Sequence, residues 1–320
     1  MIRLGVAVIV AVILYSGAWY YCAGKAKSWL ETALAGADNR PFHIGCQALD
    51  IAGYPFRIGA FCSAVTLDSA SKGLSASTGA VRSAAQIYNP GHAIVEIDGP
   101  ANLRTSDGLI AHASWQQLRS SVMAGFSGLT RMSVESNDVQ FEALGGLLAH
   151  PMSASFQHGE LHLRQNGDDL DLATDIAGLT VTTPLLAVAL PLADVKTDVT
   201  FAKMGDVLQG KTYPGLRGSA GTVRQAALDF GDKGSLALSG PFDIDENGLL
   251  SGSFNLSLSR IDELQTVLSA SFPDAADAIR QIGQVLSGFS GASGSATIKL
   301  SIRKGIVSIA FFELGRIPPV

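Results

Sequence analysis

The chain has 320 residues, enough for one large domain or two ordinary ones with a substantial core. Its net charge is -5, charged residues make up only 16%, and lysines and arginines do not cluster. Nucleic acid is therefore excluded as an expected partner, because a surface that binds phosphate needs such a cluster. Glycine is abundant at 35 residues, which favours a β-rich chain with many turns.

The N-terminal segment is the first predicted element. Residues 4–23 are 20 consecutive positions without a charge, about the length that crosses the hydrocarbon core of a bilayer as a helix. Trp19, Tyr20 and Tyr21 lie near its far end, where an aromatic belt would meet the membrane interface. We therefore expect residues 1–24 to be an uncleaved transmembrane anchor.

A cleaved signal peptide is the alternative for this segment, because Ser16 and Ala18 form a small-x-small cleavage pattern. Positive charges do not decide the orientation, since Arg3 precedes the segment and Lys25 follows it. Beyond the anchor, apolar residues at helical spacing predict a short juxtamembrane helix, which together with a linker takes residues 25–41.

Two cysteines indicate the compartment of the body. Cys46 and Cys62 lie equally far from Tyr54, so a hairpin over residues 42–67 that turns at Tyr54 would place them directly opposite each other. Structural disulfides persist in oxidising compartments and are rare in the cytosol. Two buried free thiols in a cytosolic core are the alternative. We expect a disulfide between the two cysteines and a body in the periplasm.

Strands are predicted through most of the body, because apolar and polar residues alternate. Two hairpins look alike, Val95–Ile110 and Leu236–Leu250, and each contains a Gly-Pro pair before a tight turn. Each runs toward a predicted helix. The first helix begins at a capping box of Ser114 and Gln117, and the second is an amphipathic helix over residues 262–288. Chance likeness among common turn signals is the alternative.

The fold class that follows is mainly β, of the α+β type. Extended or curled antiparallel sheets form two related β-then-helix modules behind one N-terminal transmembrane helix. The first β module with its helix takes residues 42–130, and the second, with the amphipathic helix, takes residues 131–320. An apolar sheet face that the helices leave open would form a groove for acyl chains or a partner strand, and an ordinary sealed core is the alternative.

The best metal candidate is a strand with His158, Glu160 and His162 on one face, which offers two imidazoles and a carboxylate to an ion. The competing interpretation is a half-buried strand with its polar residues in water. No fourth ligand follows from the sequence, and Arg164 on the same face would repel a cation, so no metal is expected.

Catalytic motifs are missing from the sequence. It has no Gly-x-Ser-x-Gly elbow, and the glycine-rich run Gly288–Gly294 follows a predicted helix and precedes a strand, the reverse of a dinucleotide fingerprint. Asp168, Asp169 and Asp171 surround a turn, where carboxylates are commonly solvated. We expect a protein that is not an enzyme and that carries no cofactor.

A family resemblance rests on Cys46, Gly53–Arg57, Cys62, Trp115 and the closing Gly315–Pro319. Together these residues resemble the bacterial family catalogued as domain of unknown function 2125. The resemblance covers the chain after the anchor. It implies an N-terminal membrane segment and a β-rich envelope body in Gram-negative bacteria, with no established activity, cofactor or ligand. By analogy alone, the hairpins also resemble AsmA-like envelope proteins, which handle lipid along a β-groove.

These observations predict a single-pass protein of the bacterial inner membrane whose periplasmic β-rich body binds lipid or another envelope component without catalysis. The alternative is a structural or assembly factor that docks envelope proteins. Its candidate interaction tip is the hairpin turn, formed by Tyr54, Pro55, Phe56 and Arg57. An envelope hydrolase is the third hypothesis.

Overall fold

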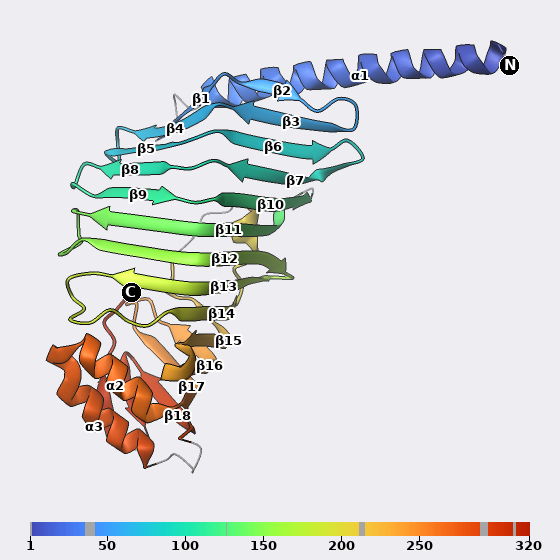
Figure 1. Cartoon of the computed structure of the whole chain (residues 1–320). Helices are drawn as coiled ribbons and strands as arrows, with labels where there is room; N and C mark the ends of the chain where they lie inside the picture. The colour runs from blue at the N-terminus through green and yellow to red at the C-terminus, as the bar shows by residue number, and fades with distance from the viewer. Residues whose placement is uncertain (1, 36–41, 126, 211–214, 289–293, 310–311) are drawn as a thin grey trace. The chain divides into compact units, whose positions relative to one another are not determined.

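The computed structural model of the chain describes residues 2–35, 42–125, 127–210, 215–288, 294–309 and 312–320. The chain forms two compact units, which are considered separately below (Figure 1). Unit 1 comprises Met1–Met123 and Ala143–Ala149, and unit 2 comprises Ala124–Glu142 and His150–Val320. The boundary predicted between residues 130 and 131 falls inside a single strand, β11 (Gly128–Leu144).

Unit 1 begins with one continuous helix, α1 (Ile2–Ala35), which joins the predicted anchor and the predicted juxtamembrane helix. It contains no proline, and leucine, alanine and other good helix formers are frequent along its length. By length and composition it can cross a membrane, a test that a signal sequence also passes. The linker predicted at its end, residues 36–41, lies outside the described residues.

The strands of unit 1 form two antiparallel ladders. One ladder has the order β1, β4, β5, β8, β9 and the other has the order β2, β3, β6, β7, β10. The strands are β1 (His43–Gln47), β2 (Asp50–Ala52), β3 (Arg57–Cys62), β4 (Ala64–Ser69), β5 (Leu74–Thr78), β6 (Val81–Gln86), β7 (Asn89–Ile97), β8 (Ala101–Thr105), β9 (Ile110–Ser114) and β10 (Gln117–Gly125). From β2 onward, each two consecutive strands pair with each other, and the chain then crosses to the other ladder.

Both ladders have one apolar and one polar face, as period-2 alternation requires. The ladder that contains β7 has an apolar face without a charged residue. The apolar side chains on this face are those of Ile58, Val81, Ala85, Ala93, Val95, Ile97, Leu118 and Val122. Its opposite face has an ion-pair row, in which Arg82 and Arg119 flank Glu96 at 3.7 and 3.0 Å and Arg82 also binds Asp98. The ladder that contains β5 has Val65, Leu67, Leu74, Ala76, Leu103 and Ala111 on its apolar face.

Unit 2 is a meander in which each strand from β12 to β19 pairs antiparallel with the next. Its strands after β11 are β12 (Met152–Asn166), β13 (Asp169–Thr182), β14 (Ala193–Phe201), β15 (Ala220–Asp229), β16 (Ser235–Ile244), β17 (Leu250–Ser259), β18 (Ala296–Arg303), β19 (Ile306–Ile309) and β20 (Phe312–Arg316). Two helices, α2 (Ile261–Ser271) and α3 (Ala276–Ser287), follow β17.

The hydrophobic core lies where α2 and α3 pack on the sheet of unit 2. Phe254 on β17 is 2% exposed, and Leu264 of α2, Leu286 of α3 and Leu300 of β18 belong to the same buried cluster. The amphipathic helix predicted over residues 262–288 is therefore confirmed. It is divided at Pro273, because proline lacks the backbone N–H that would continue the first helix.

The fold class is confirmed: most of the chain is antiparallel β-sheet, preceded by one long apolar helix. The helix predicted from Ser114 and Gln117 is wrong, since β9 and β10 occupy that segment. Leu118 and Val122 fit both a helical and an alternating pattern, and the hydrogen-bonded pairing of β10 with β7 decides for a strand. Among the described residues of unit 1, no counterpart of α2 and α3 covers the sheet.

Candidate functional site

The predicted tip is the turn between β2 and β3, and it lies against α1. Gly53 begins the turn with a φ of +120°, and a Cβ atom there would lie 2.7 Å from the Arg57 carbonyl oxygen. Only glycine fits this position without strain. The Gly53 carbonyl also accepts a hydrogen bond of 3.1 Å from the Arg57 N–H, which closes the turn.

Aromatic and polar contacts fasten this turn to α1. The Tyr54 ring meets Trp19 edge to face at 5.5 Å and stacks on Tyr20 at 5.7 Å. The Tyr54 hydroxyl lies 2.8 Å from the Ser16 hydroxyl, and the Tyr15 hydroxyl donates to the Pro55 carbonyl. Three of the four residues that the sequence suggested for an external partner, Tyr54, Pro55 and Arg57, therefore bind the chain's own helix.

Trp19 is the centre of this contact. It is 5% exposed, and its indole N–H donates to the Arg57 carbonyl at 3.1 Å. The position of Trp19 next to Tyr20 and Tyr21 predicts an interfacial belt, but the sequence gives no sign of the contact between Trp19 and Tyr54. No local pattern could reveal it, because the partners are separated by more than thirty positions in the chain. Phe56, in contrast, is 70% exposed.

Trp19→Ala is expected to loosen α1 from the turn by about 3 kcal/mol, because it removes a buried indole with its hydrogen bond. Hydrogen exchange of residues 53–57 should accelerate. Trp29→Ala is the matched control: Trp29 is on the same helix and 72% exposed, so its replacement should leave that exchange unchanged. Equal exchange in the two variants would contradict the contact.

The predicted disulfide is confirmed, with Cα atoms of Cys46 and Cys62 5.4 Å apart. The predicted register is wrong. Cys46 lies opposite Val65 of β4 and not opposite Cys62, so the two arms of the hairpin are offset by three positions from the expected pairing. The pairing of β2 with β3 has the same offset. The disulfide spans the interruption between β1 and β2, where Ala48 has a positive φ of 52°. The hairpin therefore centres between Pro55 and Phe56 and not on Tyr54.

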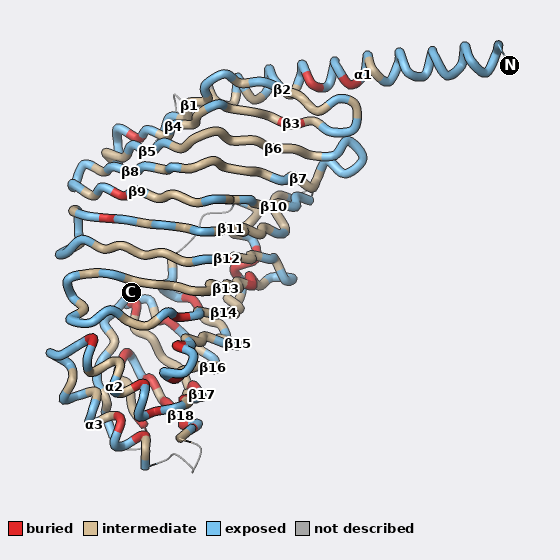
Figure 2. The backbone as a smooth tube through the Cα atoms, viewed as in Figure 1, coloured by how far each residue is buried: buried red, intermediate tan, exposed pale blue. Residues whose placement is uncertain are grey.

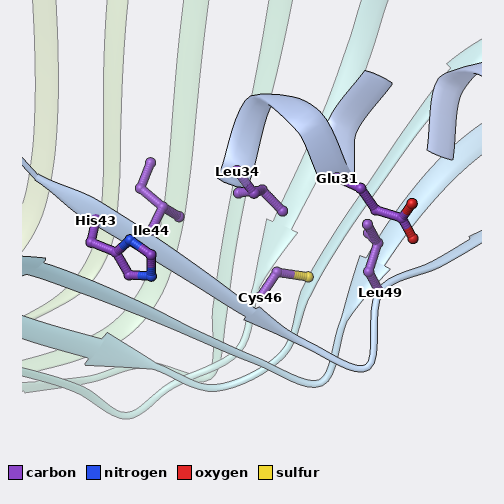
Figure 3. Close-up of a pocket in the computed structure, with 6 residues that line it drawn as sticks. All are labelled: Glu31, Leu34, His43, Ile44, Cys46 and Leu49. Carbon is purple, nitrogen blue, oxygen red and sulfur yellow. The ribbon is translucent and has the colours of Figure 1, made fainter. Parts of the chain in front are cut away.

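A pocket of about 380 Å³ lies between the end of α1 and β1 (Figure 3). Glu31 and Leu34 come from α1, and His43, Ile44, Cys46 and Leu49 complete the lining. In Figure 3 the Leu34 side chain lies above Cys46. Ile44 and Cys46 pair with Leu67 and Val65, so the pocket opens onto the edge of the apolar face of this ladder. It offers apolar contacts with a carboxylate and an imidazole at the rim.

His158, Glu160 and His162 do meet on one face of β12. The two carboxylate oxygens of Glu160 bind His158 Nε2 at 3.1 Å and His162 Nε2 at 2.9 Å. Hydrogen bonds from His162 and then His158 lower the pKa of Glu160. The other ring nitrogens face Asn137 and Ser133, so protein groups engage both imidazoles. In the described part of the chain, no group of three His, Cys, Asp or Glu side chains could hold a metal ion.

Asp171 is the buried carboxylate of unit 2, with a side chain only 8% exposed. Arg164 binds it at 2.6 Å and Arg224 at 3.3 Å, while the Thr200 hydroxyl donates to it at 2.8 Å. Burial opposes its ionisation, but the hydrogen bonds from Arg164, Thr200 and Arg224 prevail and lower the pKa of Asp171. Asp169 is also engaged, through the backbone N–H of Lys203. These contacts tie β12, β13, β14 and β15 together around one buried carboxylate.

Asp171→Asn should lower the free energy of unfolding by about 2–3 kcal/mol at neutral pH, since it leaves two guanidinium groups without their shared carboxylate. A depressed folded-state pKa stabilises the fold above the unfolded-state value and loses this effect as pH falls through the folded value. The difference between wild type and variant should therefore shrink below about pH 4. Denaturant unfolding at a series of pH values measures it, and a pH-independent difference would contradict this origin.

Comparison with known protein families matches residues 19–318 to domain of unknown function 2125, described as an uncharacterized protein conserved in bacteria. The chain belongs to this family. The family match begins at Trp19, so it includes Trp19 and Tyr20, which contact the turn, and leaves out Tyr15 and Ser16, which also bind it. A comparison with curated proteins gives no match.

Membership confirms the resemblance seen in the sequence, and its residues now have structural roles. Cys46 and Cys62 form the disulfide, Gly53–Arg57 forms the turn against α1, and the Trp115 indole donates to the Ile97 carbonyl at 2.7 Å. At the other end of the chain, Val320 donates its N–H to Gly248, and Ile317 to Gly305. These residues contribute contacts that hold the fold together.

Proposed function

We propose that this member of the family is a single-pass inner-membrane protein whose periplasmic β-rich body binds lipid acyl chains without catalysis. The observation that carries the proposal is the apolar face of unit 1. Among its described residues this unit has no helix other than α1, which contacts β1 and β2 at the edge. Figure 2 shows residues along these strands as partly buried or exposed, with few fully buried.

The contrast with unit 2 strengthens this interpretation. There, α2 and α3 cover the sheet and produce the buried cluster around Phe254. In unit 1 the apolar residues of β3, β6, β7 and β10 stay half-buried, although alternation gives them a continuous face. Covering apolar sheet surface of this kind is favourable by about 25 cal/mol for each Å² that is removed from water. An acyl chain is a suitable occupant because the face has no charged residue.

Two further features favour the proposed location. Tyr15 and Ser16 bind the turn, so the fold uses residues of α1 that signal cleavage after Ala18 would remove. The Cys46–Cys62 disulfide favours an oxidising compartment for the body. The pocket at Leu34, Ile44 and Cys46 places the end of α1 beside the edge of the ladder that contains β1 and β4.

Photocrosslinking in intact cells tests the proposal. The full chain would carry p-benzoylphenylalanine in place of Val95 in one variant and of Ile94 in another. These neighbours on β7 are both apolar and project from opposite faces. We expect a lipid adduct, identified by mass spectrometry, at Val95 and not at Ile94.

The contrary results are equally specific. A protein adduct at Val95, with no lipid adduct, would instead favour the docking hypothesis. Equal lipid yields at Val95 and Ile94 would show that the apolar face has no role in binding. In either case the proposed lipid site would be wrong, while the proposal of a membrane anchor would be unaffected.

A further inference from the structure

The exposed side chains beside α1 form a small apolar surface, here termed the tip surface, made of Phe56, Ile87 and Tyr88. Phe56 is 70% exposed and Tyr88 is 76% exposed, and Ile87 is also exposed. The Ile87 N–H donates to the Phe56 carbonyl at 3.1 Å, which joins the β2–β3 turn to the β6–β7 turn. In Figure 1 both turns lie on the side of unit 1 toward which the N-terminal half of α1 extends.

The length of the exposed N-terminal part of α1 determines where the tip surface lies relative to the membrane. Every residue from Ile2 to Leu14 is exposed, and the first contacts with the body are made by Tyr15 and Ser16. Thirteen helical residues span about 20 Å, but the hydrocarbon core of a bilayer is about 30 Å thick. A helix that crosses the membrane must therefore continue within it past Tyr15, alongside the turn that binds it.

Hydrogen bonding at this level suits an environment with little water. The Tyr15 hydroxyl donates to the Pro55 carbonyl, and the hydroxyls of Ser16 and Tyr54 bind each other. Ser16 also bonds to the Val12 carbonyl at 2.7 Å. Polar groups in hydrocarbon are tolerated when they have partners within the protein. The hydroxyl and carbonyl groups of α1 and the turn form these hydrogen bonds with each other, where helix and turn meet.

The tip surface has the composition of a membrane interface. Tyrosine is favoured at the level of lipid headgroups, and phenylalanine lies on the apolar side of interfacial segments. Arg57, the charged residue of this turn, has a long side chain that can reach the headgroups. If Tyr20 and Tyr21 lie at the interface, Tyr15 and the turn beside it reach about 7 Å below that level. Interfacial segments bury their apolar side to about this depth.

We propose that the tip surface inserts into the outer leaflet of the same bilayer that α1 crosses. This inference rests on the proposed membrane anchor and does not require the lipid site on the sheet. The body is then held by two attachments, α1 and the tip surface, which fix its orientation. Ile58, Ala85 and Ala93, at the adjoining end of the apolar face, face the membrane, so acyl chains reach the sheet without crossing water.

Spin labelling of the full chain in vesicles of phosphatidylethanolamine and phosphatidylglycerol tests the insertion. Cys22→Ser removes the exposed free thiol, and the disulfide keeps Cys46 and Cys62 unreactive. Nitroxides are then placed at Phe56→Cys and Tyr88→Cys, two exposed sites that do not disturb the core. Lys72→Cys, in the turn before β5, is the aqueous control, and Ile9→Cys in α1 is the membrane control.

At each site, the rate at which the nitroxide collides with oxygen, which concentrates in lipid, is compared with the rate at which it collides with a water-soluble nickel chelate. At Phe56 and Tyr88 the ratio of oxygen to nickel collisions should exceed the ratio at Lys72 several-fold and approach that at Ile9. A lipid-like ratio at Ile9 with aqueous ratios at Phe56 and Tyr88 would overturn the insertion and leave the anchor intact. Aqueous ratios at all four sites would overturn both the insertion and the anchor.

Discussion

Replacing both disulfide-bonded cysteines, in a Cys46→Ala and Cys62→Ala double variant, is expected to lower the stability of unit 1 by about 3 kcal/mol. The bond closes a loop with a sequence separation of 16, and a loop of this size contributes about that much by restricting the unfolded chain. Unit 1 has little buried core to compensate, because the buried cluster lies in unit 2. Guanidinium unfolding, followed by hydrogen exchange in β3 and β6, measures the loss.

Cys22→Ala is the matched control for this variant. Cys22 is exposed on α1 and is not in a disulfide, so the same chemical change there should leave the exchange of β3 and β6 unaltered. If the double variant exchanged at the wild-type rate, the disulfide would not stabilise the unit. Reduction of the wild-type protein should reproduce the effect of the double variant, which separates loss of the bond from loss of the side chains.

Phe254→Ala is expected to destabilise unit 2 by about 3–5 kcal/mol. The ring is 2% exposed within the cluster formed by α2, α3 and the sheet, so its removal leaves a cavity that the surrounding strands can only partly fill. Thermal or denaturant unfolding monitored on unit 2 measures the change. Phe254→Leu retains most of the apolar volume and should cost about 1.5 kcal/mol or less.

Phe312 on β20 provides the control for the core prediction. It is an exposed phenylalanine in the same unit, and its replacement by alanine should change stability by no more than about 0.5 kcal/mol. Similar losses for Phe254→Ala and Phe312→Ala would mean that burial under α2 and α3 does not determine stability. The core assignment in unit 2 would then be wrong.

Local signals predicted the features of this fold that depend on neighbouring residues. The uncharged run from Leu4 indicated α1, alternation indicated the strands, and the spacing of apolar residues with Pro273 indicated α2 and α3. The two cysteines were identified as a pair by their position around the turn, although their strand register was not. An interruption such as the one at Ala48 shifts a register, and turn symmetry alone does not reveal it.

The features that sequence reasoning missed depend on contacts between distant segments. Trp19 and Tyr54 meet because α1 runs alongside the first turn, and nothing in either segment specifies the other. Asp171 and Arg224 are brought together across three strands, with a register shift between Asp198 and Val199. The segment after Ser114 was assigned to a helix because pairing with β7, rather than local propensity, decides its structure.

The intact mass of the protein isolated from native membranes tests most directly whether the body stays attached to its anchor in an oxidising compartment. The account predicts a chain that retains residues before Trp19 and gains the mass of two hydrogens on reduction, as one Cys46–Cys62 bond requires. A mature chain that begins at Trp19, or a mass unchanged by reduction, would contradict it.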